Sequence, residues 1–171
     1  MNSSFKKLVV AALLIALCFV GANIKIMGSI AFDAVPAFIG VLLLGYGYGA
    51  VIGAIGHLFS ALLAGFPLSL PVHLVTAVFM AITMVAFLYV FRLCSKKMPK
   101  IVAYIIAGIV AVIINAPLSL FVLQPLLFPG AFATLFTPLS IAATANVVVA
   151  ILIYALGGKQ FHKILGFNNK K

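Results

Sequence analysis

Residues 70–91 read LPVHLVTAVFMAITMVAFLYVF, a run without a single charged side chain. The nine residues that follow, RLCSKKMPK, carry one arginine and three lysines. A helix needs roughly 20 apolar residues to cross the hydrocarbon core of a bilayer. The stretch therefore predicts a transmembrane helix that ends in a basic loop.

The composition extends this interpretation to the whole chain. Of 171 residues, 66% are hydrophobic and only 7% are charged, whereas a soluble domain has about 25% charged residues. So few charges cannot cover a surface in contact with water. The net charge of +10 arises from eleven basic residues and one acid, Asp33. Because the basic residues lie between apolar runs, they indicate membrane topology rather than a nucleic-acid partner.

We predict an all-α integral membrane protein, a single domain over residues 1–171 with six transmembrane helices. The predicted spans are 8–24, 32–45, 49–64, 70–91, 101–123 and 138–156. The glycines of Gly45–Gly49 separate the second span from the third. Both are shorter than an average bilayer requires, so they form either short buried helices or a re-entrant pair.

The basic residues predict the orientation. With an even number of spans, ten of the eleven fall on one side: Lys6, Lys7, Arg92, Lys96, Lys97, Lys100, Lys159, Lys163, Lys170 and Lys171. Positive loops remain in the cytoplasm during insertion, so we expect both termini there. The alternative is that the first span is a signal peptide cleaved near Val20-Gly21-Ala22; its removal would leave five spans and put the basic loops outside.

Prolines mark the expected helix ends. Thr137-Pro138 is typical of an N-cap followed by the first helical residue, and Pro36 and Pro71 fall in first turns. Pro117 lies inside the fifth span and should kink it, exposing carbonyl groups. The outer segment Gln124–Thr137 is long and apolar, so we expect it to fold back as a cover.

The chain lacks the residues that most enzymes need. One acid excludes paired-carboxylate catalysis and carboxylate-rich metal sites, and no nucleotide-binding loop or hydrolase motif occurs. The histidines at positions 57, 73 and 162 are too dispersed to predict a metal site. We therefore expect neither catalysis, nor a metal, nor a cofactor held by the chain itself.

Polar residues inside the apolar spans predict a binding site. His57, Ser60, His73, Asn115 and Asn146 all fall in the middle or outer part of the bilayer at about 1.5 Å per residue. Polar groups at this depth usually face a cavity or a partner, and this set describes an outward-opening pocket. The alternative is that each only bonds a neighbouring helix.

Asp33 and Lys25 flank the predicted outer mouth. Asp33 either caps the second helix, with Lys25 as its counter-ion, or the two residues orient a ligand or close the first loop over it. A lone acid near hydrocarbon needs a compensating partner.

Small residues at intervals of four allow close helix contacts in lipid. Gly49 and Gly53, and the series Gly56, Ser60 and Ala64, favour packing within the chain. Ala12 and Ala16 lie near the cytoplasmic end of the first span, where they favour contact with a partner protein.

These features resemble a known family. Six spans, cytoplasmic termini, an Ala-x-x-x-Ala in helix one and no ATP site are similar to the S component of an energy-coupling factor (ECF) vitamin transporter. Residues 24–26 (IKI), 32–37 (FDAVPA), 56–61 (GHLFSA), 64–68 (AGFPL) and 70–73 (LPVH) resemble S components assigned to α-ribazole, the nucleoside of the cobalamin lower ligand.

The resemblance implies a binding subunit in the bacterial plasma membrane. Its outer-half pocket would lie mainly among helices four to six, under the loops after helices one, three and five. Helices one to three would face the transmembrane T component, with Ala12 and Ala16 at the contact, and two partner ATPases would use ATP. The loops Lys25–Asp33 and Ala64–Leu70 would be lids, and the loaded subunit would topple to present its pocket to the cytoplasm.

The predicted ligand contacts are Lys25, Asp33, His57, Ser60, His73, Asn115 and Asn146. Charge balance favours a neutral ligand, and a nucleoside would need an aromatic or apolar slot, for which Phe66, Phe121 and Phe132 are candidates. The alternatives are an S component for another small heterocyclic vitamin, a structural membrane scaffold, or an intramembrane enzyme built near His57 or His73.

Overall fold

The computed structural model describes residues 3–26 and 30–166. Its helices are α1 (Ser3–Asn23), α2 (Val35–Leu44), α3 (Tyr46–Leu63), α4 (Leu70–Cys94), α5 (Lys100–Ile113), α6 (Ser119–Leu123) and α7 (Ala131–Leu165). A π-helix, η1 (Ile114–Leu118), joins α5 to α6, and a 3-10 turn, η2 (Gln124–Leu126), follows. Two antiparallel strands, β1 (Lys25–Ile26) and β2 (Ile30–Ala31), form a small hairpin.

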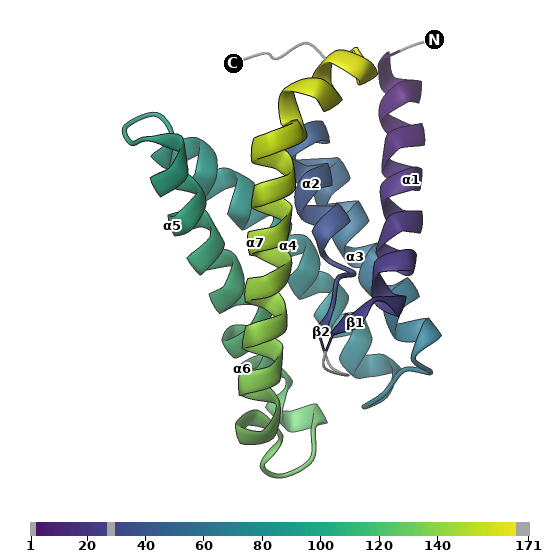
Figure 1. The fold of residues 1–171 in the computed structure, drawn as a ribbon. Helices are drawn as coiled ribbons and strands as arrows, with labels where there is room; N and C mark the ends of the chain where they lie inside the picture. Colours follow the sequence, from purple (N-terminus) through teal and green to yellow (C-terminus); the bar gives the residue numbers. More distant parts are fainter. Residues whose placement is uncertain (1–2, 27–29, 167–171) are drawn as a thin grey trace.

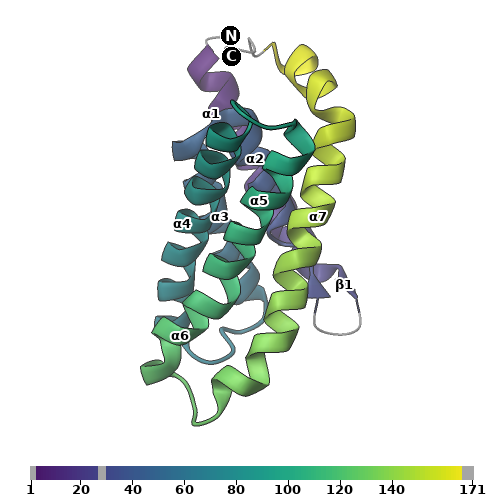
Figure 2. The ribbon, with the colours of Figure 1, turned by 90° about the vertical axis from the view of Figure 1, so that its left-hand side faces the viewer.

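The helices form one upright bundle (Figure 1). Within the described residues, five segments are long and apolar enough to cross a membrane: Ser4–Asn23, Tyr46–Leu63, Leu70–Cys94, Lys100–Leu126 and Ala131–Leu165. The sixth, α2, has 10 residues and is therefore about 15 Å long, half of a hydrocarbon core. The start of α1 and the end of α7 lie at the same, upper end of the bundle in Figures 1 and 2.

The short helix α2 is the centre of the core. Eight of its ten residues are buried, from Val35 to Leu44. Phe38 meets Phe87 of α4 edge to face, with ring centroids 5.1 Å apart. A helix that is apolar on all sides is stable only where other helices surround it, and α2 packs against α1, α3, α4 and α7.

Glycines of α3 allow the neighbouring helices to approach closely. A methyl group at Gly49 would collide with Val41, and one at Gly53 would lie 2.9 Å from Met84 Cγ. At Gly56 it would lie 2.7 Å from Cys18 Sγ. The prediction that the small residues of the third span pack within the chain is therefore confirmed for these three glycines. Ala12 and Ala16 are exposed on the outside of α1.

We expect Gly56→Ala to lower the free energy of unfolding by about 1–3 kcal/mol, because the added methyl group overpacks the contact with Cys18. Gly47→Ala is the matched control, since a methyl group at Gly47 meets nothing within 4 Å; it should be neutral or stabilise by up to ~1 kcal/mol through helix propensity. Thermal unfolding in detergent measures both. Equal effects of the two changes would contradict the close contact.

The predicted start of the sixth span is wrong. Helix α7 begins at Ala131, not at Pro138, because Gly130 turns the chain in a left-handed conformation (φ 83°) and Thr134 donates to its carbonyl. Pro138 lies inside the helix. The predicted outer segment 124–137 thus shortens to a connection between Leu123 and Ala131, although the apolar residues Leu127 and Leu135 from this region do line a cavity.

The predicted distortion at Pro117 is confirmed as the π-helical segment η1. Within this distorted segment the Ser119 hydroxyl donates to the carbonyls of Asn115 and Ala116. The break between the second and third spans is also confirmed, but it is confined to Gly45 (φ 93°), and α3 begins at Tyr46.

Candidate functional site

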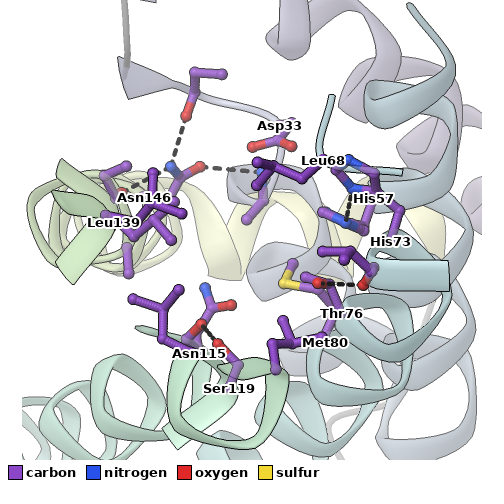
Figure 3. Close-up of a pocket in the computed structure, with 18 of the residues that line it drawn as sticks. Asp33, His57, Leu68, His73, Thr76, Met80, Asn115, Ser119, Leu139 and Asn146 are labelled. Atoms are coloured by element: carbon purple, nitrogen blue, oxygen red, sulfur yellow. Dashed lines mark hydrogen bonds between the residues drawn. The ribbon is translucent and has the colours of Figure 1, made fainter. Parts of the chain in front are cut away.

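A cavity of about 240 Å³ lies at the end of the bundle opposite the termini. Segments from across the sequence contribute to its wall: Ala31, Asp33, Ala34, His57, Leu68, Val72, His73, Thr76, Met80, Asn115, Ser119, Leu120, Leu123, Leu127, Leu135, Leu139, Ala142, Ala143 and Asn146. Figure 3 shows Asp33 and Asn115 on opposite sides, with Asn146 and the two histidines between them.

Five of the seven predicted ligand contacts line this cavity: Asp33, His57, His73, Asn115 and Asn146. Ser60 is not in the wall, but its hydroxyl lies beside the Asp33 carboxyl. The side chain of Lys25 lies outside the described part of the structure. The predicted aromatic slot is wrong, because the wall holds none of Phe66, Phe121 and Phe132 and is aliphatic instead. Phe121 points outward from α6 and is 64% exposed.

The sequence analysis missed two polar wall residues, Thr76 and Ser119. Each follows a predicted contact by one helical turn, at i+3 from His73 and i+4 from Asn115, and residues at these spacings share a helix face. A search for polar residues one helical turn after each predicted contact would therefore have found Thr76 and Ser119.

The two histidines form a hydrogen-bonded pair. His57 Nε2 and His73 Nδ1 are 3.2 Å apart, and His73 Nε2 bonds the carbonyl oxygen of Pro67. A carbonyl only accepts, so in the neutral pair His73 Nε2 carries the proton and His73 Nδ1 accepts from His57 Nε2. His57 Nδ1 is then an acceptor.

The pair also fixes the loop between α3 and α4. This loop is bent through positive φ angles at Phe66 (52°), Leu68 (72°) and Ser69 (98°), a conformation that costs energy for residues other than glycine. The bond from His73 to Pro67 holds the loop in this shape over the cavity, where Leu68 contributes to the wall.

Asn146 connects α7 to the segment that carries Asp33. Its Oδ1 accepts from the backbone N–H groups of Ala34 and Val35, each at 3.0 Å. Its Nδ2 donates to the carbonyls of Ala31 (2.7 Å) and Ala142 (2.9 Å). All four hydrogen-bonding positions of the amide are therefore used, and the hairpin lies against the lower half of α7 (Figure 2).

Capping of the second helix, the first of the two roles left open for Asp33, is wrong for this reason. Helix α2 has Ala34 at its N-cap and no side-chain cap from its own segment. The N–H groups of a helix that begins inside a membrane must be satisfied by the protein, and Asn146 of α7 bonds two of them. Asp33 lines the cavity with the Ser60 hydroxyl beside its carboxyl, and the backbone on both sides of it is held by Asn146.

We expect Asn146→Leu to lower the free energy of unfolding by at least about 2 kcal/mol, because it leaves the N–H groups of Ala34 and Val35 buried without acceptors. Thr144→Val is the matched control: Thr144 is exposed on the same helix and its hydroxyl donates only to Ser140 of that helix. Unfolding in detergent and hydrogen exchange at residues 31–35 measure the effect. Unchanged exchange there in Asn146→Leu would contradict the connection.

The electrostatics of the cavity come from one carboxyl group. Asp33 is the only acidic residue in the wall as described. Burial raises the pKa of Asp33 above its ordinary value, whereas hydrogen bonds from the Ser60 hydroxyl and from nearby backbone N–H groups lower the pKa. The described wall therefore presents one carboxyl and two imidazoles to a solute, and no lysine or arginine.

This shift predicts how stability depends on pH. The pKa of Asp33 is higher in the folded state than in the unfolded state. The folded state therefore binds the proton more tightly, and this stabilisation is complete at a pH below the pKa of the unfolded state. It is lost as the pH rises through the higher pKa of the folded state. We expect Asp33→Asn to remove this loss, so that the variant gains thermal stability over the wild type as pH rises from about 4 to 8. Melting curves that stay parallel over this range would contradict the buried position of Asp33.

The amide of Asn115 is available for binding. Asn115 is half-buried and borders the cavity from η1. Its backbone carbonyl accepts from Ser119, but among the described residues its side chain takes part in no hydrogen bond. It therefore offers a solute one NH₂ group and one carbonyl oxygen.

The fold and the site together define a class: a helical membrane protein with a small cavity, aliphatic with several polar groups, at one end of its bundle. The model of the family of ECF transporter substrate-specific components matches residues 6–157. The chain therefore belongs to this family, which implies a small-molecule substrate and partnership with the T component and the ATPases of an ECF transporter. No characterised protein and no solved structure gave a significant match.

Proposed function

We propose that this chain is the high-affinity binding subunit of an ECF importer for a vitamin or vitamin precursor, with α-ribazole, the cobalamin precursor nucleoside, as its solute. The observation that carries the proposal is the hydrogen-bonding character of the cavity. The hydrogen-bonding groups of its wall are mostly acceptors: the Asp33 carboxyl, His57 Nδ1, the Asn115 carbonyl and the hydroxyl oxygens of Thr76 and Ser119, which already donate elsewhere.

A cavity rich in acceptors requires a solute rich in donors, since buried polar groups without partners are costly. The hydroxyl groups of a ribose meet this requirement. The aliphatic wall, including Met80, Leu120 and Leu139, suits the face of a methylated heterocycle. The volume of about 240 Å³ is close to the lower limit of ~300 Å³ for small-molecule pockets, which favours a nucleoside over a larger corrinoid.

The charge of the wall supports an unphosphorylated solute. A phosphate would face the Asp33 carboxyl without a lysine or arginine in the described wall to balance it, and burial of such an unpaired charge is unfavourable. His57, His73 and Asn115 act as ligand contacts in this proposal. Asn146 contributes by holding the backbone beside Asp33, and its direct contact with the solute remains a prediction.

The chain supplies binding and its partners supply energy. The T component would contact the exposed alanines of α1, Ala12 and Ala16, and two ATPase subunits would hydrolyse ATP; the chain itself would be neither an enzyme nor the holder of a cofactor. Ten basic residues near the termini and the 95–99 turn favour a cytoplasmic position for that end of the bundle. The cavity would then open to the outside of a bacterial plasma membrane.

The experiment is a calorimetric titration of the purified chain in lipid nanodiscs with α-ribazole and with α-ribazole 5′-phosphate. We expect saturable binding of one α-ribazole per chain and at least tenfold weaker binding of the phosphate. Equal affinities would contradict the role of Asp33 in the wall. No binding of either compound, with a different small molecule retained by the protein, would reject α-ribazole as the solute.

A further inference from the structure

A second hollow is lined by residues of α5 and α7, two helices that run side by side in Figures 1 and 2. Its volume is about 430 Å³. The residues that line it are aliphatic apart from one tyrosine and one threonine: Ile101, Tyr104, Ile105, Gly108, Ile109, Val112, Ile113, Thr144, Val147, Val148, Ile151 and Leu152. We call this hollow the α5–α7 groove. It contains none of the residues of the solute cavity.

One wall of the groove is a ridge of four isoleucines, Ile101, Ile105, Ile109 and Ile113, each more than half exposed. The ridge covers twelve residue steps and is therefore about 18 Å long. One leaflet of a bilayer has roughly 15 Å of hydrocarbon, half of the ~30 Å core. At Gly108 the two helices touch, since an added methyl group would lie 3.0 Å from Val147 Cγ1. The groove thus has the length of a single acyl chain.

Lysines lie at one end of the groove. Lys100 is the first residue of α5, directly before Ile101, and Lys96 and Lys97 lie in the preceding turn; all three are exposed. The chain has a single acid, Asp33, and it faces the cavity at the opposite end of the bundle. Among the described residues no side-chain carboxylate therefore lies near these lysines, and clusters of this kind attract anionic lipid headgroups.

We propose that the α5–α7 groove and these three lysines form a binding site for one anionic phospholipid. One acyl chain lies along the isoleucine ridge, and the phosphate-bearing headgroup lies at Lys96, Lys97 and Lys100. The positive charge of the three lysines favours an anionic lipid over a zwitterionic lipid, which has the same acyl chains and no net charge. It also favours a lipid over an apolar helix of another protein, which has no need of lysines at the end of the groove.

The test is native mass spectrometry of the purified, delipidated chain titrated with dioleoyl phosphatidylglycerol or dioleoyl phosphatidylcholine. We expect one phosphatidylglycerol per chain, bound at least tenfold more tightly than phosphatidylcholine. The triple change Lys96→Gln, Lys97→Gln and Lys100→Gln should bring the two lipids within twofold of each other. The matched triple change of Lys6, Lys7 and Lys163 to Gln removes the same charge at a distance from the groove and should preserve the preference.

A second variant tests the groove itself. Val148→Trp fills the groove and should weaken the binding of phosphatidylglycerol at least tenfold, whereas Val78→Trp, on the exposed face of α4, should not. Thermal unfolding of each variant confirms that it is folded. Equal binding of the two lipids to the wild type, survival of the preference without Lys96, Lys97 and Lys100, or full binding by Val148→Trp would each overturn the site. None of these measurements involves the transported solute, so the result is independent of the proposed transport function.

Discussion

Replacement of both Ala12 and Ala16 by tryptophan is expected to abolish solute uptake while the isolated chain still binds its solute. Both alanines are exposed on the outer face of α1, on the same side as the exposed Leu13 and Leu17. They lie four residues apart, the spacing at which small residues let two helices approach closely in lipid. Two indole rings would hold a partner helix away from α1.

Uptake should fall at least tenfold in cells or proteoliposomes that contain the complete ECF module, and co-purification with the T component should be lost. The matched control is the double change Val78→Trp and Ile82→Trp, which places the same pair of rings at the same spacing on the exposed face of α4. If uptake survives in the α1 variant, or falls equally in the α4 control, the alanines do not form the coupling contact.

The second large effect is expected at Asn115. Asn115→Leu removes the one amide of the cavity that has no hydrogen bond in the described fold, so the loss should appear in solute binding and not in stability. An unpaired buried polar group costs about 1–3 kcal/mol, which corresponds to a weakening of roughly 5- to 150-fold in affinity. Calorimetry with the solute and thermal unfolding without it separate the two effects.

Thr144→Val is again the control, because Thr144 lies outside the cavity in the α5–α7 groove and its loss should leave the affinity unchanged. Wild-type affinity in Asn115→Leu would remove this residue from the site. A loss of affinity accompanied by a lower melting temperature would show that Asn115 stabilises the fold instead of binding the solute.

Much of the fold could be predicted from the sequence, because a helix surrounded by lipid must consist of apolar residues without charge, and such runs are visible in the sequence. Charge-free runs predicted six apolar spans, and Pro117 predicted the distortion of the fifth. The second and third spans were both predicted to be short, whereas among the described helices only α2 is short and α3 is long enough to cross a membrane. The boundary at residue 138 was not predictable from the proline, because residues 131–137 continue the helix and Gly130 provides the turn. The central position of α2 depends on packing between helices that are distant in sequence.

Most of the predicted site residues could be identified from the sequence, but the hydrogen bonds that hold them in place could not. Polar residues at membrane depth indicated Asp33, His57, His73, Asn115 and Asn146, and all five line the cavity. No sequence pattern indicated that the Asn146 amide bonds a helix more than a hundred residues earlier. The aromatic slot failed because exposed and cavity-facing phenylalanines have the same sequence pattern in a chain whose surface faces lipid.

The central claim is that the cavity at the end opposite the termini holds a small solute. The most direct test is mass spectrometry of the small molecules released from the chain purified in detergent, compared with Ala143→Trp, a change that fills the cavity from the buried wall residue Ala143. We predict one solute in stoichiometric amount with the wild type and none with a folded Ala143→Trp variant. The same solute released from both proteins in equal amount would contradict the claim.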